Sequence, residues 1–424
     1  MSVTVLKNGR IIDPANGRDG QGDLWLADGK IAAAGDEIPA DATVFDCAGK
    51  WIVPGLIDLH VHLREPGHEY KETIASGALA AAAGGFTAIA CMPNTSPVND
   101  NAAITRAILE KGAAGPARVY PVGAASLGSK GESLAEYAEM KDAGIVAVSD
   151  DGRPVLASQL MRRALEYADS HDLLVMSHAE DSGLSQHGCM HEGLVSTRLG
   201  LPGIPAAAES VMVYRDAALA ELTGARLHIC HVSCEASLAV IRLAKARGVR
   251  ITAETAPHYF TLTDEAVSGY NTNAKMNPPL RSEADRQAIR AALADGTLDA
   301  IATDHAPHSI LEKEVEFNLA ANGIIGLETA LPLGLALVRD GLLSPARLVE
   351  LMSVNPARII GVAGGTLAAG AVADVTVIDP ERRFVFDART NHSKSANSPF
   401  WGWELQGRAV LTFLAGELAY RLQD

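Results

Sequence analysis

The sequence predicts an α/β fold in which a (β/α)₈ TIM-like barrel is joined to a small β-sandwich domain built from both chain termini. Apolar runs of strand length recur eight times, and the segments between them are long enough for helices. The two ends of the chain instead carry short strand-like segments with Asn-Gly or Asp-Gly turn signals and no helices between them. These observations separate a central barrel from a terminal β domain.

Each of the eight apolar runs ends in polar or turn residues, which is typical of the strands of a parallel barrel. Segments between them, such as 133–144 and 158–171, repeat apolar residues at helical spacing. The runs lie at 51–63, 86–94, 118–124, 144–152, 173–181, 226–233, 249–258 and 298–307. In a barrel of this kind the catalytic residues come from the C-terminal ends of the strands.

The strand-like segments at the two chain ends need each other to be stable. An isolated hairpin is marginal in water, so the simplest way to bury both sets is to pair them in one domain. The segments are 3–13, 22–35 and 42–49 at the start and 374–386 and 407–420 at the end. We therefore expect residues 1–54 plus 362–424 to form a composite β domain and residues 55–361 to form the barrel.

The composition limits the classes of function. With 48% hydrophobic and 21% charged residues among 424, the chain has the composition of a soluble globular protein. Its most apolar stretch, 77–92, is too short and too interrupted by glycine to span a bilayer. A net charge of -15 without a basic stripe argues against a nucleic-acid partner. Five scattered cysteines and a start without an apolar leader predict a cytoplasmic protein.

Metal-binding residue types gather at the predicted strand ends. His60 and His62, in "DLHVHLREPG", are two residues apart on a strand and therefore face the same side. Four further strand ends supply one such residue each: Asp151, His178, His231 and Asp304. A single histidine at a strand end is more often a hydrogen-bonded structural residue, but six such residues at one face indicate a site for zinc or a similar divalent ion.

Other candidate residues have weaker support. His187, Cys189 and His191 alternate in a glycine-rich loop and suggest a second metal site, but no fourth ligand lies nearby in the sequence. Cys230 lies within a strand run, where core packing is the simpler interpretation. His258, in "TAPHYF", stays ambiguous between the two roles.

Arg64 is the cation best placed to bind an anionic small substrate. It follows His62 by two residues and so leaves the strand on the same side, and its planar guanidinium suits a carboxylate. The alternative is a surface ion pair with Glu65 or Glu69.

These stretches resemble the dihydroorotases of the amidohydrolase superfamily, of the longer bacterial type that often partners aspartate transcarbamoylase. The resemblance covers essentially the whole chain, and "DLHVHLREPG" and "ATDHAPH" are its most specific parts. It also rests on "MPNT" at 92, "SDDG" at 149, "SHAED" at 177, "TAPHYF" at 255, "NPPLR" at 277 and "SKSANSPFWG" at 393.

The resemblance implies one or two Zn²⁺ ions per subunit. Many relatives place a carboxylated lysine at the fourth strand as a bridge between two metals. Here that strand ends in "SDDG", so Asp151 would bridge, and we expect one tightly bound ion and one weaker one. The implied ligands are His60, His62, Asp151, His178, His231 and Asp304.

The resemblance also implies an activity and a set of site residues. The activity is the reversible hydrolysis of the cyclic amide of dihydroorotate to N-carbamoyl-L-aspartate in pyrimidine synthesis, by a homo-oligomer that we expect to be a dimer. Asp304 would act as general acid and base. The implied substrate residues beside Arg64 are Asn94, Asn277, His308 and the backbone near Asn322 and Gly323.

Two other functions remain open from the sequence. An allantoinase or hydantoinase would share the barrel and the histidine pair, but those relatives generally carry the bridging lysine and lack the "APH" after Asp304. A non-catalytic scaffold that only supports a transcarbamoylase is the second alternative. The six ligand-type residues are all present in this chain, which disfavours the scaffold.

Overall fold

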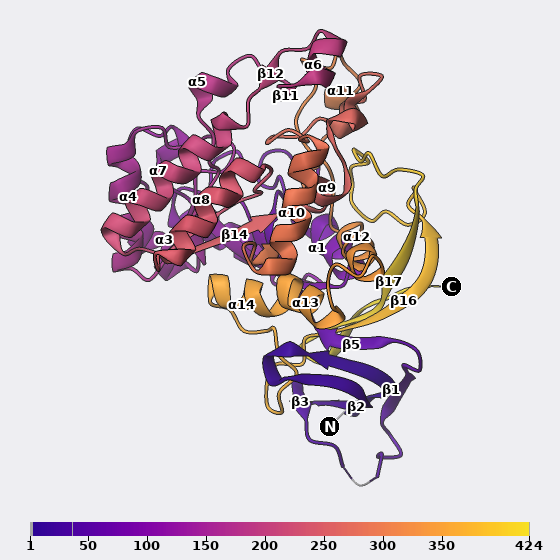
Figure 1. The fold of residues 1–424 in the computed structure, drawn as a ribbon. Coiled ribbons are helices and arrows are strands. Elements are labelled where there is room, and N and C mark those ends of the chain that lie inside the picture. The colour runs from indigo at the N-terminus through magenta and orange to yellow at the C-terminus, as the bar shows by residue number, and fades with distance from the viewer. Residues whose placement is uncertain (1–2, 36, 424) are drawn as a thin grey trace.

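The computed structural model describes residues 3–35 and 37–423, and it places a helix-covered barrel beside a second sheet (Figure 1). In this described part of the chain, eight parallel strands follow one another around the barrel in sequence order. They are β6 (Leu56–Val61), β7 (Phe86–Cys91), β8 (Arg118–Ala124), β9 (Ala147–Ser149), β10 (Leu174–Ser177), β13 (Leu227–Ile229), β14 (Ile251–Thr255) and β15 (Ala300–Ile301). The predicted barrel is confirmed.

The barrel closes between its first and last strands. His305 forms a parallel bridge with Val61, and the amide of His62 donates to the carbonyl of His305 at 2.8 Å. His305 also bridges Ile324. These contacts lie at and just beyond the C-terminal ends of β6 and β15, the face of the barrel where side chains serve a site.

Helices cover the outside of the barrel. Around the strands lie α1 (Ile74–Ala83), α2 (Ala102–Gly112), α3 (Tyr137–Ala143), α4 (Ser158–Ser170), α7 (Ala207–Thr223), α8 (Glu235–Ala246) and α10 (Glu283–Asp295), followed by α12 (Ala330–Arg339), α13 (Pro345–Val349), a π-helical turn (Glu350–Val354) and α14 (Asn355–Ile360). Side chains of Thr73, Asn101 and Ser282 accept hydrogen bonds from the first free amides of α1, α2 and α10, which favours helix initiation at these positions.

Shorter elements build the loops. An excursion from the barrel contains α5 (Ser182–Ser185), β11 (Met190–His191), α6 (Leu194–Leu199) and β12 (Gly203–Ile204), at the top of Figure 1. Helices α9 (Pro257–Thr261) and α11 (Ile310–Lys313) follow β14 and β15. Short 3₁₀ turns lie at Pro14–Asn16, Leu127–Ser129, Asp264–Val267 and Thr272–Ala274.

Strands from both chain ends form one sheet, as the sequence predicted. Its described strands run in the order β18 (Glu417–Arg421), β17 (Glu404–Leu414), β16 (Val375–Val385), β5 (Trp51–Pro54), β1 (Val3–Asp13), β2 (Arg18–Ala27) and β3 (Lys30–Ala32), and β4 (Thr43–Asp46) also pairs with β1. β5 joins the two ends, because it pairs with β1 on one side and β16 on the other. Leu6, Ile52, Val375 and Phe413 share its buried core.

The segment between β16 and β17 reaches the mouth of the barrel. Ser395 Oγ donates to the carbonyl of Lys71 at 2.7 Å, and Asn397 Nδ2 donates to the carbonyl of Ala306 at 2.9 Å. Lys71 follows β6 and Ala306 follows β15, so this C-terminal segment touches the loops on both sides of the barrel seam. Its polar side chains satisfy backbone groups that the barrel alone leaves free.

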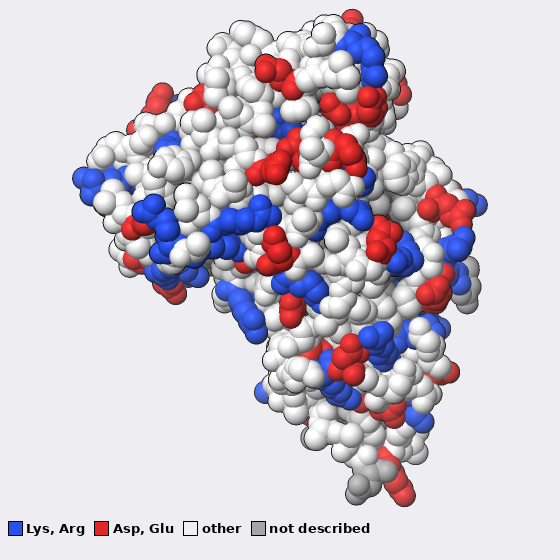
Figure 2. Space-filling model, in the orientation of Figure 1, with Lys and Arg blue, Asp and Glu red and all other residues white. Residues whose placement is uncertain are grey.

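Basic and acidic side chains lie side by side over much of the face shown in Figure 2. Arg242 of α8 pairs with Asp295 at 3.1 Å, and Lys245 pairs with Asp299 at 2.7 Å. None of the helices in residues 3–35 and 37–423 combines the length and apolar character that a membrane span requires.

We expect Gly84, at the end of α1, to be intolerant of a side chain. A Cβ there would lie 2.1 Å from the backbone oxygen of Leu327, and that backbone cannot move aside as a flexible side chain can. Gly84→Ala should therefore lower the free energy of unfolding by about 1–3 kcal/mol. Gly20→Ala in β2 is the matched control, since a Cβ there meets nothing within 4 Å. Equal unfolding midpoints in urea for both variants would contradict the close approach.

Candidate active site

The structure brings the six ligand-type residues together at one end of the barrel. His60 lies in β6 with His62 just beyond it, and Asp151, His178, His231 and Asp304 follow β9, β10, β13 and β15. All six side chains are buried. Residues from five strands therefore meet in one small space. The sequence predicted this meeting only from the rule that the C-terminal ends of barrel strands share a face.

One half of the cluster is built around His60 and His62. Nε2 of His60 lies 3.1 Å from Oδ1 of Asp151 and 3.7 Å from Oδ1 of Asp304. Nε2 of His62 lies 3.0 Å from the same oxygen of Asp304 and 3.6 Å from Oδ2 of Asp151. Two imidazole nitrogens and two carboxylates thus face one small space.

The other half is built around His178 and His231. Nδ1 of His178 lies 2.8 Å from Nε2 of His231, and the two nitrogens lie 3.6 Å and 3.5 Å from Oδ1 of Asp151. Asp151 is therefore common to both halves of the cluster.

The donor set fits a divalent ion. Ligand atoms about 2.0–2.1 Å from a tetrahedral ion lie about 3.3 Å from one another, close to the separations observed here. Within the described residues, Nε2 of His60 is buried without a hydrogen-bond partner although it points at Asp151. Such a nitrogen is costly to bury unless an ion takes its lone pair. Groups that could hold an ion include His60, His62 and Asp151, and Asp151, His178 and His231.

Backbone strain accompanies the site. His231, Asp304 and Arg64 adopt φ values of 36°, 48° and 62°, in the left-handed region. Such conformations cost non-glycine residues about 1–3 kcal/mol each and cluster at functional sites. Here they occur at the ends of β13, β15 and β6.

Both carboxylates are ionised. Burial raises the pKa of Asp304, but the charge of His60 and the hydrogen bond with His62 outweigh this and lower it to about 2. Burial likewise raises the pKa of Asp151, and the surrounding histidines bring it well below its usual range. Each group is therefore an anion that is able to bind a cation.

Polar side chains behind the cluster orient three of the histidines. Glu254 Oε1 lies 2.9 Å from Nδ1 of His60, and Glu180 Oε2 lies 2.9 Å from Nε2 of His178. Hydrogen bonds of this kind fix the ring orientation and raise the basicity of a metal ligand. Neither glutamate was predicted from the sequence. Glu180, two residues after His178, was the easier to find.

Asn94 has the same relation to His62. Its Oδ1 lies 2.8 Å from Nδ1 of His62, and its Nδ2 lies 3.5 Å from Oδ2 of Asp151. The residue that the resemblance assigned to substrate therefore also holds a ligand-type histidine in place.

A cavity of about 300 Å³ opens above the cluster. The expected substrate residues that line it are Arg64, Asn94, Asn277, His308 and Asn322, together with His62, Asp151, His178 and Asp304. Gly323 is not among the lining residues, but a Cβ there would lie 2.7 Å from Cδ2 of His308, which lines the cavity. Its amide donates to the carbonyl of Lys275 at 3.0 Å and so is not free for a substrate. The structure thus places five of the six expected substrate residues in the cavity wall and Gly323 directly behind His308.

Arg64 is buried in this cavity and not paired at the surface. Its Nε donates to the carbonyl of Pro307 at 3.2 Å, and its Nη2 lies 3.3 Å from Nε2 of His308. Glu65 contacts Lys111, and Glu69 accepts from the amide of Gly67. Among the described residues neither glutamate pairs with Arg64, so the surface ion pair that the sequence left open is wrong.

The remaining sequence candidates lie outside the cluster. Burial lowers the pKa of His258 to about 4, and its ring packs against Tyr259. Nδ1 of His191 lies 3.3 Å from Arg281, and no ion-holding group within the described chain includes His187, Cys189 or His191. The predicted packing role of Cys230 agrees with its place in a buried cluster, although it also lies near His60 and Glu254.

Comparisons with known proteins identify the family. A family model described as dihydro-orotase-like matches residues 49–237. A dihydroorotase from Desulfotalea psychrophila is 68% identical over 418 residues, which cover 99% of each chain. The chain belongs to the dihydroorotase family. A second dihydroorotase, from Syntrophotalea carbinolica, is 59% identical over 422 residues, again covering 99% of each chain. The resemblance drawn from the sequence is confirmed.

Solved structures extend the likeness beyond the dihydroorotase family. The L-hydantoinase (dihydropyrimidinase) from Arthrobacter aurescens aligns with a TM-score of 0.88 at 25% identity, covering 99% of this chain and 96% of that one. A D-hydantoinase aligns with a TM-score of 0.84 at 26% identity, covering 98% and 94%. Dihydroorotases and hydantoinases thus share one architecture, and the residues of the site must decide between their substrates.

Glu254→Gln should weaken divalent-metal binding about 10-fold to 100-fold, because a neutral amide holds the His60 ring less firmly and makes it less basic. Titration with a chromophoric chelator measures this affinity directly. Glu72→Gln is the matched control, since Glu72 is also buried but bonds His305, which is outside the ligand set. If Glu254→Gln binds metal as tightly as the control, Glu254 does not support the site.

Proposed function

We propose that this chain is a zinc-dependent dihydroorotase that reversibly hydrolyses the cyclic amide of dihydroorotate to N-carbamoyl-L-aspartate in pyrimidine biosynthesis. One observation carries the choice of substrate within the cyclic-amide hydrolases. Arg64, a buried cation, faces the cavity beside the cluster of histidines and aspartates. A hydantoin or dihydrouracil ring lacks the carboxylate that such a cation would bind.

The proposed zinc ligands are the six clustered residues, with Asp151 shared between two positions. Imidazole and carboxylate groups in these numbers suit zinc, and one or two ions per subunit are compatible with the two halves of the cluster. A bound ion would act as a Lewis acid at the ring amide carbonyl and lower the pKa of the attacking water.

Asp304 is the proposed proton carrier. It lines the cavity, and its low pKa keeps it ionised before reaction. It would accept the proton of the attacking water and return it to the ring nitrogen as the amide bond breaks. Read in reverse, the same transfers close carbamoyl aspartate to the ring.

Arg64 is the proposed carboxylate ligand, and its neighbours complete the substrate shell. Asn277 Nδ2 is held at 3.0 Å by Glu180 Oε2, which leaves its amide oxygen available to the ring. His308, Asn322 and Asn94 supply further polar groups at the cavity wall.

Two alternatives are less well supported. A hydantoinase would be expected to carry a bridging lysine, whereas in this chain Asp151 lies between the two halves of the cluster. The non-catalytic scaffold would need no buried ligand set, and here all six residues converge. From the resemblance we extend the proposal to a cytoplasmic dimer that can partner aspartate transcarbamoylase. Light scattering with and without that enzyme would test the dimer and the partnership.

The substrate assignment is tested by comparing dihydroorotate with dihydrouracil, which lacks the carboxylate. The wild type should prefer dihydroorotate. Arg64→Met should lose about 10-fold to 100-fold in kcat/KM for dihydroorotate with its metal content retained, because the carboxylate loses a charge-assisted partner. Its rate with dihydrouracil should change far less. A wild type that prefers dihydrouracil would refute the assignment, and an equal loss with both substrates would make Arg64 structural.

Asp304→Asn should lower turnover about 10²-fold to 10⁴-fold in both directions, because an amide cannot accept the proton. At least one metal should remain bound, since His60, His62, His178 and His231 are unchanged. Turnover and metal content measured on the same preparation separate the two effects. Near-normal turnover at neutral pH would exclude Asp304 as the proton carrier.

A further inference from the structure

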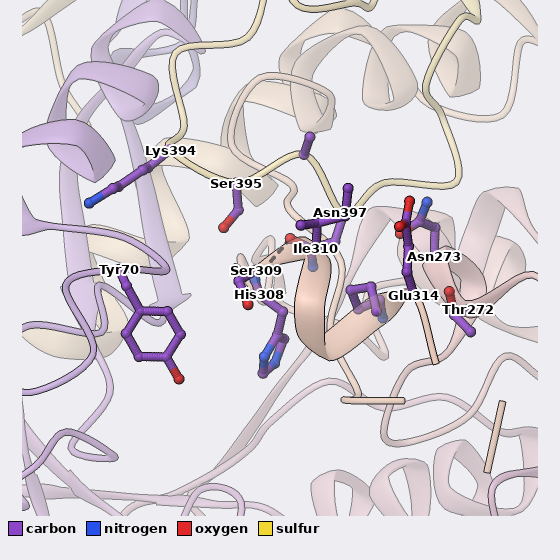
Figure 3. Close-up of a pocket in the computed structure, with 12 residues that line it drawn as sticks. Tyr70, Thr272, Asn273, His308, Ser309, Ile310, Glu314, Lys394, Ser395 and Asn397 are labelled. Atoms are coloured by element: carbon purple, nitrogen blue, oxygen red, sulfur yellow. Dashed lines mark hydrogen bonds between the residues drawn. The ribbon is translucent and has the colours of Figure 1, made fainter. Parts of the chain in front are cut away.

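His308 stands in the wall between two cavities, with a cation at each ring nitrogen. It lines the cavity above the cluster and also the neighbouring cavity shown in Figure 3, where it lies near Tyr70 and Ser309. Nε2 of His308 lies 3.3 Å from Nη2 of Arg64, and Nδ1 lies 3.3 Å from Nζ of Lys71.

The two contacts cannot both be hydrogen bonds to one neutral ring. Arginine and lysine only donate, whereas a neutral imidazole accepts at one nitrogen and donates from the other. The ring is neutral, because burial and the charges of Arg64 and Lys71 lower the pKa of His308 to about 2. One of the two nitrogens therefore carries a proton that faces a cation.

The surroundings of Nδ1 make it the acceptor. The acidic group near it is Glu312, whose Oε2 is 3.7 Å away and already accepts from the amide and hydroxyl of Ser309. Oε1 of Glu312 is paired with Lys71 at 2.6 Å. A proton on Nδ1 would thus face the Lys71 ammonium at 3.3 Å with its carboxylate neighbour occupied. A proton on Nε2 faces the Arg64 guanidinium at 3.3 Å, but this side of the ring also borders the cavity, where an anion can accept from both groups.

We infer that Lys71 is a positioning residue that holds His308 in the tautomer with the proton on Nε2, so that Nε2–H and Arg64 Nη2 together bind one carboxylate of the substrate. This rests on the proposed function, and it adds to it the residue that makes His308 a donor. A carboxylate placed between His308 Nε2–H and the Arg64 guanidinium would accept from both, and would so offset the repulsion between these two donors.

Contacts on both sides fix Lys71 for this role. Glu312 holds its ammonium, and Ser395 donates to its carbonyl at 2.7 Å. Among the described residues Lys313 is a further cation close to His308, and its ammonium donates to the carbonyls of Ala321 and Gly323. Lys71 is therefore the cation whose ammonium is placed to control Nδ1.

Lys71→Met should let the proton move to Nδ1, where Glu312 would attract it once its lysine is gone. Nε2 would then accept from Arg64, and both donors to the substrate would be lost. We expect KM for dihydroorotate to rise about 10-fold with kcat changed much less. Ring ¹⁵N shifts of His308 in the metal-loaded, histidine-labelled enzyme report the tautomer directly. The His308→Gln spectrum assigns the signal among the 13 histidines.

Two further variants keep the test decisive. Lys71→Arg retains a donor and should restore most of the affinity and the wild-type tautomer. Lys394→Met, at the rim of the neighbouring cavity, removes a lysine that bonds the carbonyl of Glu69 and should leave both readouts unchanged. An unchanged tautomer and KM in a folded Lys71→Met variant would overturn the inference. A wild type without dihydroorotate hydrolysis would instead overturn the proposed function.

Discussion

The carboxylate of Asp151 is the contact on which the site depends, because it lies within 3.6 Å of a ring nitrogen of four histidines. Six titratable side chains are buried at the barrel mouth, and burying such groups unpaired costs several kcal/mol each. Their mutual contacts, and an ion among them, offset that cost. Removing the central carboxylate would leave His178 and His231 without the carboxylate that they share, and His60 and His62 sharing Asp304 alone.

A second layer of polar groups extends this arrangement into the barrel. Behind His60, Glu254 also lies 3.1 Å from Nε2 of His228, whose Nδ1 is 2.8 Å from Thr252 Oγ1. Strand interiors that would otherwise hold aliphatic side chains therefore carry a connected polar chain. Such chains are stable only when each member is satisfied, so they fix a unique arrangement of the residues above them.

Sequence patterns predicted the fold and the six clustered residues because both follow from short-range rules. Strand ends of a parallel barrel share a face, so His60 and Asp304 could be placed together although 244 positions separate them in the chain. The partner of His60 could not be predicted, because Glu254 lies in an apolar run and its pairing depends on the register between distant strands. The position of Lys71 could not be predicted either. It is set by Glu312 and by a C-terminal segment that the sequence placed in the terminal domain.

The pairing of β5 with β1 and β16 has a consequence for how the chain is made. The strand that covers the free edge of β5 begins at Val375, more than 300 residues later in the sequence. At synthesis rates of about 5–20 residues per second, the N-terminal strands wait on the order of tens of seconds for their partners on the ribosome. During that time β5 presents an unpaired apolar edge of the kind that promotes aggregation. The short length of β5 limits this risk, because a strand of four residues offers little backbone for another chain to pair with.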